Sequence, residues 1–258
     1  MKRYVALGSS MVAGPGIAPR APGSPRAAGR SARNYPHLVA QSLGVDLVDV
    51  TFSGARTAHV LHESQFGSPP QVDVLDGTEK LVTVTIGGND VGYVPMLFAA
   101  GLPRFTRWLP VLGGRLRGLL DANEREHALA EVGAALAEVG RIVRRRSPDA
   151  TVLFVDYLTL LPPAGISAPP LSDTDAALGR RIAATLERYT AEAAAVTGCA
   201  LVRAGEASRR NHAWSADPWT TRFGFPVPGR PAPLHPNARG MRAVADLVLA
   251  TVSNPDIR

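Results

Sequence analysis

Four short segments of this chain carry side chains that together could attack a carbonyl group. They are Gly8-Ser9-Ser10, Ser53-Gly54-Ala55, Gly87-Gly88-Asn89-Asp90 and Leu234-His235-Pro236-Asn237. A serine hydroxyl becomes an effective nucleophile when a base such as histidine takes its proton, and the attacked carbonyl needs donors for its developing oxyanion. Each segment alone is weak evidence, because serine, asparagine and aspartate also favour turns. Four of them in this order make nucleophilic catalysis the leading hypothesis.

Three of these segments directly follow predicted strands. Residues 5–7, 45–50 and 81–86 are short apolar runs, which are typical of strands buried on both faces. A strand that ends in small polar residues delivers them to the carboxyl edge of a parallel sheet, where open α/β folds hold their ligands. The fourth segment opens the last helix, which we expect to begin near Pro236. All four segments are therefore predicted to meet at one edge of the sheet.

The remaining elements alternate in the same way. Further strands are predicted at 151–155 and 200–203, and helices at 34–43, 124–146 and 173–197. The pattern predicts an α/β fold, a three-layer α/β/α sandwich around a five-stranded parallel sheet, formed by residues 1–258 as a single domain. Residues 91–120 are apolar but interrupted by glycine, proline and arginine, and we expect them to form a lid or pocket wall.

The four segments resemble the sequence blocks of the SGNH, or GDSL-type, hydrolase family, and the resemblance runs from end to end of the chain. That family has Gly-Asp-Ser first, then a glycine, then Gly-x-Asn-Asp, and finally Asp-x-x-His-Pro. Here Ser9 replaces the aspartate of the first block, and Ala232 stands where the last block has its aspartate. The resemblance implies a flavodoxin-like SGNH fold and a serine esterase that hydrolyses carboxylic esters.

The same resemblance assigns roles to individual residues. It implies that Ser10 is the nucleophile and His235 the general base, so that catalysis passes through an acyl-enzyme on Ser10. The oxyanion hole would comprise the backbone N–H groups of Ser10 and Gly54 with the side-chain amide of Asn89. An amide suits the last position because a carboxylate would repel the oxyanion.

The residue that orients His235 is left open by the sequence. A base histidine needs an acceptor at Nδ1 to fix its tautomer, and the usual aspartate is absent. One substitute is a main-chain carbonyl of residues 231–234, most simply that of Ala232, which would make a Ser-His dyad. The other is a carboxylate from elsewhere, for which Asp217 is best placed. We favour the carbonyl.

Two other functions stay open. The same site would suit an acyltransferase or thioesterase, and a non-catalytic binding module could keep the fold. The expected substrate is a small-molecule, lipid or carbohydrate ester with an acyl or acetyl group; the apolar residues 91–120 favour acyl groups over highly charged substrates. The sequence does not indicate the oligomeric state.

No metal or organic cofactor is expected. His59 and His62 lack a third ligand at a matching spacing, and the first loop lacks a phosphate-binding motif. The net charge of +6 comes mostly from scattered arginines, so no nucleic-acid partner is expected. No apolar stretch is long enough for stable membrane insertion. Because the first strand begins close to Met1, we expect a cytoplasmic protein, or a secreted one if a leader was removed.

Overall fold

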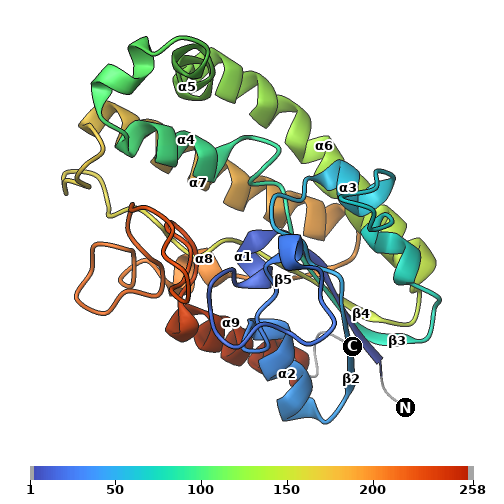
Figure 1. Ribbon diagram of the computed structural model, residues 1–258. Helices are drawn as coiled ribbons and strands as arrows, with labels where there is room; N and C mark the ends of the chain where they lie inside the picture. The colour runs from blue at the N-terminus through green and yellow to red at the C-terminus, as the bar shows by residue number, and fades with distance from the viewer. Residues whose placement is uncertain (1–2, 255–258) are drawn as a thin grey trace.

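A five-stranded parallel sheet forms the centre of the computed structural model, which describes residues 3–254 (Figure 1). Its strands are β1 (Arg3–Gly8), β2 (Asp46–Asp49), β3 (Glu79–Thr85), β4 (Thr151–Val155) and β5 (Ala200–Val202). They lie in the order β2-β1-β3-β4-β5, and every neighbouring pair is parallel. The predicted α/β fold is confirmed. In this flavodoxin-like order the chain reverses direction across the sheet between β1 and β3, where such folds form their ligand crevice.

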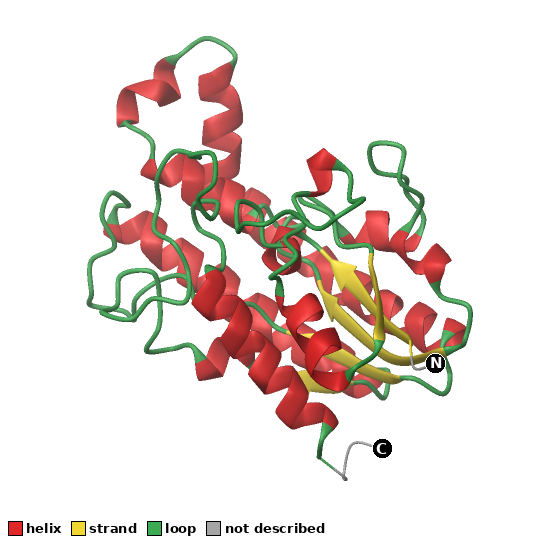
Figure 2. Ribbon diagram, turned by 60° about the horizontal axis from the view of Figure 1, so that its bottom comes forward, coloured by secondary structure: helices red, strands yellow, loops and turns green. Residues whose placement is uncertain are grey.

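Helices cover both faces of the sheet, and β1 shows why. Tyr4 and Ala6 contribute to one apolar core, whereas Val5 and Leu7 contribute to the other. The first core is covered by α2 (Tyr35–Leu43) and α9 (Ala238–Val252), which pack against each other. The second is covered by α6 (Ala122–Arg146) and α7 (Asp173–Val196), and Figures 1 and 2 show these helix pairs on opposite sides of the sheet.

Short helices gather around the connections between these layers. They are α1 (Ser10–Ala13), α3 (Thr57–Leu61), α4 (Tyr93–Gly101), α5 (Leu112–Leu120) and α8 (Ala204–Ala207), with 3₁₀ turns η1 (Arg26–Ala28), η2 (Gln71–Val74) and η3 (Arg104–Trp108). The segment 91–120 thus consists of α4, η3 and α5, as short helices joined by loops. Of these, α4 packs against α7, and Figure 1 shows α5 beyond α4 at the outer edge of the molecule.

The last helix begins later than the sequence predicted. Its first residue is Ala238, because the side chain of Asn237 accepts hydrogen bonds from the N–H groups of Arg239 and Gly240 at 2.9 and 3.0 Å. An asparagine in this role is a strong helix start, and it leaves Pro236 outside the helix. In the part of the chain that the structure describes, no helix is long and apolar enough to cross a bilayer.

Candidate active site

Ser10 stands at the sharp turn where β1 ends and α1 begins. The turn requires Gly8, which has φ +150°; a Cβ there would lie 2.5 Å from the carbonyl oxygen of Thr85 on β3. Ser10 is then the first residue of α1. The first N–H groups of a helix have no partner within the helix, and that of Ser10 has no hydrogen bond among residues 3–254.

His235 faces Ser10 across a single hydrogen bond. Its Nε2 atom lies 2.8 Å from Oγ of Ser10, and its Nδ1 atom lies 2.7 Å from the carbonyl oxygen of Pro233. A carbonyl can only accept, so Nδ1 carries the proton and Nε2 presents its lone pair to the serine. This is the geometry of a serine paired with a neutral base.

Among the carbonyls of residues 231–234, the sequence predicts most simply that of Ala232. The carbonyl beside His235 is instead that of Pro233. The Ala232 oxygen instead accepts the hydroxyl of Thr221 at 2.6 Å. Asp217 is exposed and forms an ion pair with Arg239 on α9, so its carboxylate does not occupy the Nδ1 position either.

Local backbone geometry explains which carbonyl is chosen. Leu234 adopts φ +59°, in the left-handed region that few leucines enter. This residue turns the chain between Pro233 and His235, so that the carbonyl of one meets the ring of the other. Thr221 holds the backbone of His235 in place. Its N–H donates to the His235 carbonyl at 2.9 Å, and its hydroxyl accepts the His235 N–H at 3.2 Å.

The other two predicted segments lie beside this pair. The Phe52 N–H donates to the Gly8 carbonyl at 3.0 Å, which brings residues 53–55 to the end of β1. Asn89 then donates one amide N–H to the Ala55 carbonyl at 2.8 Å, and its second amide N–H has no hydrogen bond among residues 3–254. Gly54, at φ +79°, needs glycine, and its N–H makes no hydrogen bond within the described chain.

Burial controls the protonation state of His235. It lowers the pKa of the imidazole below its ordinary value, and the hydrogen bond to Pro233 opposes this only in part. Desolvation disfavours the charged imidazolium. The ring is consequently neutral, as a base must be, over a wider range of pH than a free histidine.

Residues 6–243 match the GDSL-like Lipase/Acylhydrolase family. The chain belongs to this family. The match spans all four segments described above, and it identifies the protein as an SGNH-type serine ester hydrolase of the α/β/α fold.

Several relatives of this hydrolase come from Streptomyces. It is 33% identical over 256 residues to Lipase 2 of Streptomyces coelicolor, an alignment that covers 94% of this chain and 83% of the relative. The crystal structure of an extracellular lipase from Streptomyces rimosus superposes with a TM-score of 0.78 at 25% identity, covering 98% of this chain and 100% of the other. Phospholipase A1 from Streptomyces albidoflavus gives 0.79 at 24% identity, covering 98% and 99%, and shows the same fold.

Tyr157 is a residue of this site that the sequence did not single out. Its hydroxyl accepts the Gly88 N–H at 2.8 Å, and a Cβ at position 88 would overlap its ring. Burial raises the pKa of Tyr157 to about 12, while interaction with Ser9 and Gly88 opposes the shift. The phenol thus links the segment before Ser10 to the segment before Asn89. The only sequence signal was the second glycine of residues 87–88.

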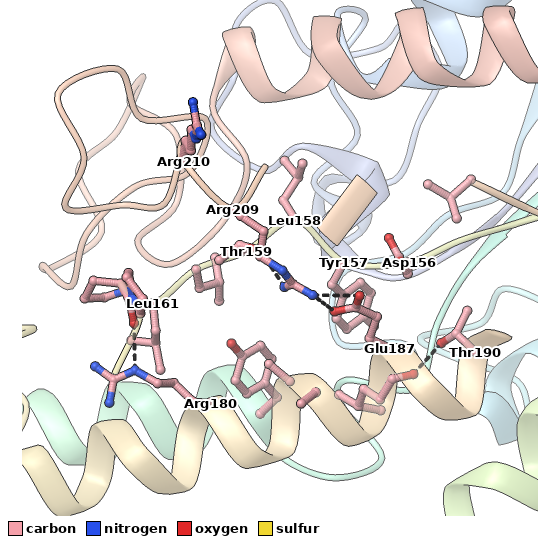
Figure 3. Close-up of a pocket in the computed structure, with 18 of the residues that line it drawn as sticks. Asp156, Tyr157, Leu158, Thr159, Leu161, Arg180, Glu187, Thr190, Arg209 and Arg210 are labelled. Carbon is pink, nitrogen blue, oxygen red and sulfur yellow. Dashed lines mark hydrogen bonds and ion pairs between the residues drawn. The ribbon is translucent and has the colours of Figure 1, made fainter. Parts of the chain in front are cut away.

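Tyr157 also lines a cavity of about 400 Å³ between α7 and the chain after β4. Its walls are mostly apolar, and Figure 3 shows Arg209 reaching across it to Glu187 on α7. Burial raises the pKa of Asp156, at the edge of this cavity, to about 7. Ser10, Gly54, Asn89 and His235 do not line this cavity, so Tyr157 is the residue of the candidate active site that it touches.

His59, one of the two histidines considered as metal ligands, has other partners. Nδ1 of His59 accepts the Arg56 N–H at 3.0 Å, and its Nε2 lies 3.7 Å from a carboxylate oxygen of Glu63. Among residues 3–254, no group of three or more histidine, cysteine or acidic side chains is arranged to hold a metal ion.

Proposed function

We propose that this hydrolase cleaves acyl esters through an acyl-enzyme on Ser10, with His235 as general base in a Ser-His dyad. The observation that carries the proposal is the pair of contacts of one imidazole, 2.8 Å to Ser10 Oγ and 2.7 Å to the Pro233 carbonyl. The first contact provides a route for the serine proton, and the second fixes the tautomer that can receive it.

The reaction then has two stages. Ser10 Oγ attacks the ester carbonyl as its proton passes to Nε2 of His235, which returns that proton to the leaving alcohol. Water, deprotonated by His235, hydrolyses the acyl-enzyme and releases the acid. In both stages the oxyanion would be held by the N–H groups of Ser10 and Gly54 and by the remaining amide N–H of Asn89. One such donor is worth about 3–4 kcal/mol in the transition state.

A neutral carbonyl makes this dyad weaker than a triad in one respect. It fixes the ring as an aspartate does, but it stabilises the imidazolium less, because it carries no full charge. The pKa of His235, lowered by burial, is consistent with that environment. The proposal accordingly assigns orientation to Pro233 and leaves charge stabilisation to the surroundings.

Lipid esters are the proposed substrates, in preference to carbohydrate esters. The support comes from relatives named as lipases in Streptomyces coelicolor and Streptomyces rimosus and from the apolar segment 91–120, which we propose as a pocket wall or lid of a single domain. The comparisons give no support for the cytoplasmic location that we expected. One solved relative is described as extracellular, and we propose that this hydrolase is also exported.

Kinetics on a series of p-nitrophenyl esters tests this function. Ser10→Ala and His235→Ala should each lower kcat/KM by at least about a thousandfold, in line with the loss of a nucleophile or base in other serine hydrolases. Ser9→Ala is the matched control, because it removes a neighbouring hydroxyl. An inactive Ser9→Ala beside an active Ser10→Ala would refute the assignment, and an inactive parent enzyme would favour a binding module.

A further inference from the structure

The segment between α4 and α5 exposes large apolar side chains at its outer end. Phe105, Trp108, Leu109 and Val111 are 67%, 84%, 42% and 80% exposed. We define these four residues as the tip surface. They belong to η3 and to the turn that leads into α5, which form the projection at the upper left of Figure 2.

The tip surface is not needed to hold its own segment together. Leu116 of α5 is buried, as are Met96 and Leu97 of α4. Gly101, at the end of α4, lies so close to the ring of Phe223 that a Cβ would overlap it. The base of the projection is therefore anchored by its inward side chains, and the four outward ones are left to water. An exposed apolar cluster of this kind marks a site of contact with a partner protein or a membrane.

The charge around the tip surface indicates what kind of partner this surface contacts. Residues 91–120 contain no aspartate or glutamate but four arginines, at positions 104, 107, 115 and 117. Arg104 and Arg115 are exposed. Tryptophan and phenylalanine favour the boundary between lipid headgroups and acyl chains, and arginines beside them are attracted to anionic headgroups.

We propose that the tip surface docks on the surface of an anionic phospholipid layer. The aromatic side chains would enter the headgroup region while Arg104 and Arg115 contact lipid phosphates, and the protein would lie on the layer without crossing it. The placement is useful for an esterase, since α4 begins a few residues after Asn89 and leads directly to the tip. The docking does not depend on which ester is cleaved or on the role of Ser10.

Vesicle sedimentation with the Ser10→Ala variant tests the docking without hydrolysis of the lipid. Vesicles of phosphatidylglycerol and phosphatidylcholine in equal parts should bind at least about tenfold more tightly than vesicles of phosphatidylcholine alone, a difference of about 1.4 kcal/mol. Adding Phe105→Ser and Trp108→Ser should weaken the binding by at least another factor of about ten. Adding Phe66→Ser is the matched control, because Phe66 is 83% exposed but lies outside the tip.

A second readout identifies the side chain that enters the lipid. Brominated acyl chains should quench the fluorescence of Trp108, and the quenching should disappear in Trp108→Phe. Thermal unfolding of each variant confirms that it is folded. The proposal is overturned if the parent does not bind, if the double tip variant binds as the parent does, or if the two vesicle types bind equally. It is also overturned by a dimer that the tip variant dissociates, since a second copy would then cover this surface.

Discussion

Replacing Asp217 by asparagine should leave ester hydrolysis almost intact. The substitution keeps the size of the side chain and removes its charge. In the structure that charge pairs with Arg239, whereas Nδ1 of His235 is satisfied by the Pro233 carbonyl at 2.7 Å. We therefore expect kcat/KM to stay within roughly tenfold of the parent, against the loss of about 10⁴ that follows when the acid of a true triad becomes an amide.

The two outcomes differ by a large free energy. A 10⁴-fold loss of kcat/KM corresponds to about 5.4 kcal/mol of transition-state stabilisation, since each factor of ten in rate is about 1.36 kcal/mol. The ion pair that Asp217→Asn breaks is exposed, with 69% and 55% of its two side chains accessible. Such pairs contribute about 0–1 kcal/mol to stability. The melting temperature should consequently fall by no more than about 4 °C.

The assay is kcat/KM for p-nitrophenyl butyrate, measured with the melting temperature of each variant. Asp73→Asn provides the matched control, because Asp73 also forms an exposed ion pair, with Arg146 at 3.0 Å. Both variants should behave alike. A folded Asp217→Asn enzyme that has lost about 10⁴ in activity, beside an active Asp73→Asn enzyme, would replace the dyad by a triad.

Three further predictions follow from the same geometry. Asn89→Ala should lower kcat by about 10²–10³ with little change in KM, because the amide acts on the oxyanion; an effect on KM alone in steady-state kinetics would contradict this. Burial lowers the pKa of His235, so the neutral base persists to lower pH and the acid limb of the kcat/KM profile should have its midpoint below about 6.5; a midpoint above that value would be inconsistent with it. Tyr157→Phe removes the acceptor of the Gly88 N–H, and an unpaired buried donor costs about 1–3 kcal/mol. The Tyr157→Phe substitution should therefore lower kcat by about tenfold with KM preserved. An unchanged kcat would argue against a role for the phenol.

The fold was predictable because its signals are local and repeated. The apolar positions of α6 recur every three or four residues, and Leu136, Val139 and Val143 are indeed fully buried. Residues 5–7 were predicted as a strand buried on both faces, and β1 contributes to both cores. The meeting of the first three segments then follows from a parallel sheet, which collects the carboxyl ends of its strands at one edge, and the fourth segment reaches that edge at the start of α9.

The acceptor for His235 was not predictable to the residue. Which of the carbonyls of Ala232 and Pro233 meets the ring depends on the left-handed backbone of Leu234. A leucine in the sequence gives no indication of that conformation. The start of α9 was misplaced for a related reason, since both Pro236 and Asn237 suit a helix start and the side chain of Asn237 decided it. Tyr157 could not be identified from the sequence, because its partner is the main-chain N–H of Gly88, in a distant segment.

Labelling with a fluorophosphonate, followed by peptide mass spectrometry, tests the central claim most directly. The reagent should add one phosphonyl group per chain, on Ser10, with parallel loss of ester hydrolysis. His235→Ala should slow the labelling, and Ser10→Ala should abolish it. Attachment to Ser9, or full inhibition without any adduct on Ser10, would contradict a mechanism in which Ser10 is the nucleophile and His235 is its base.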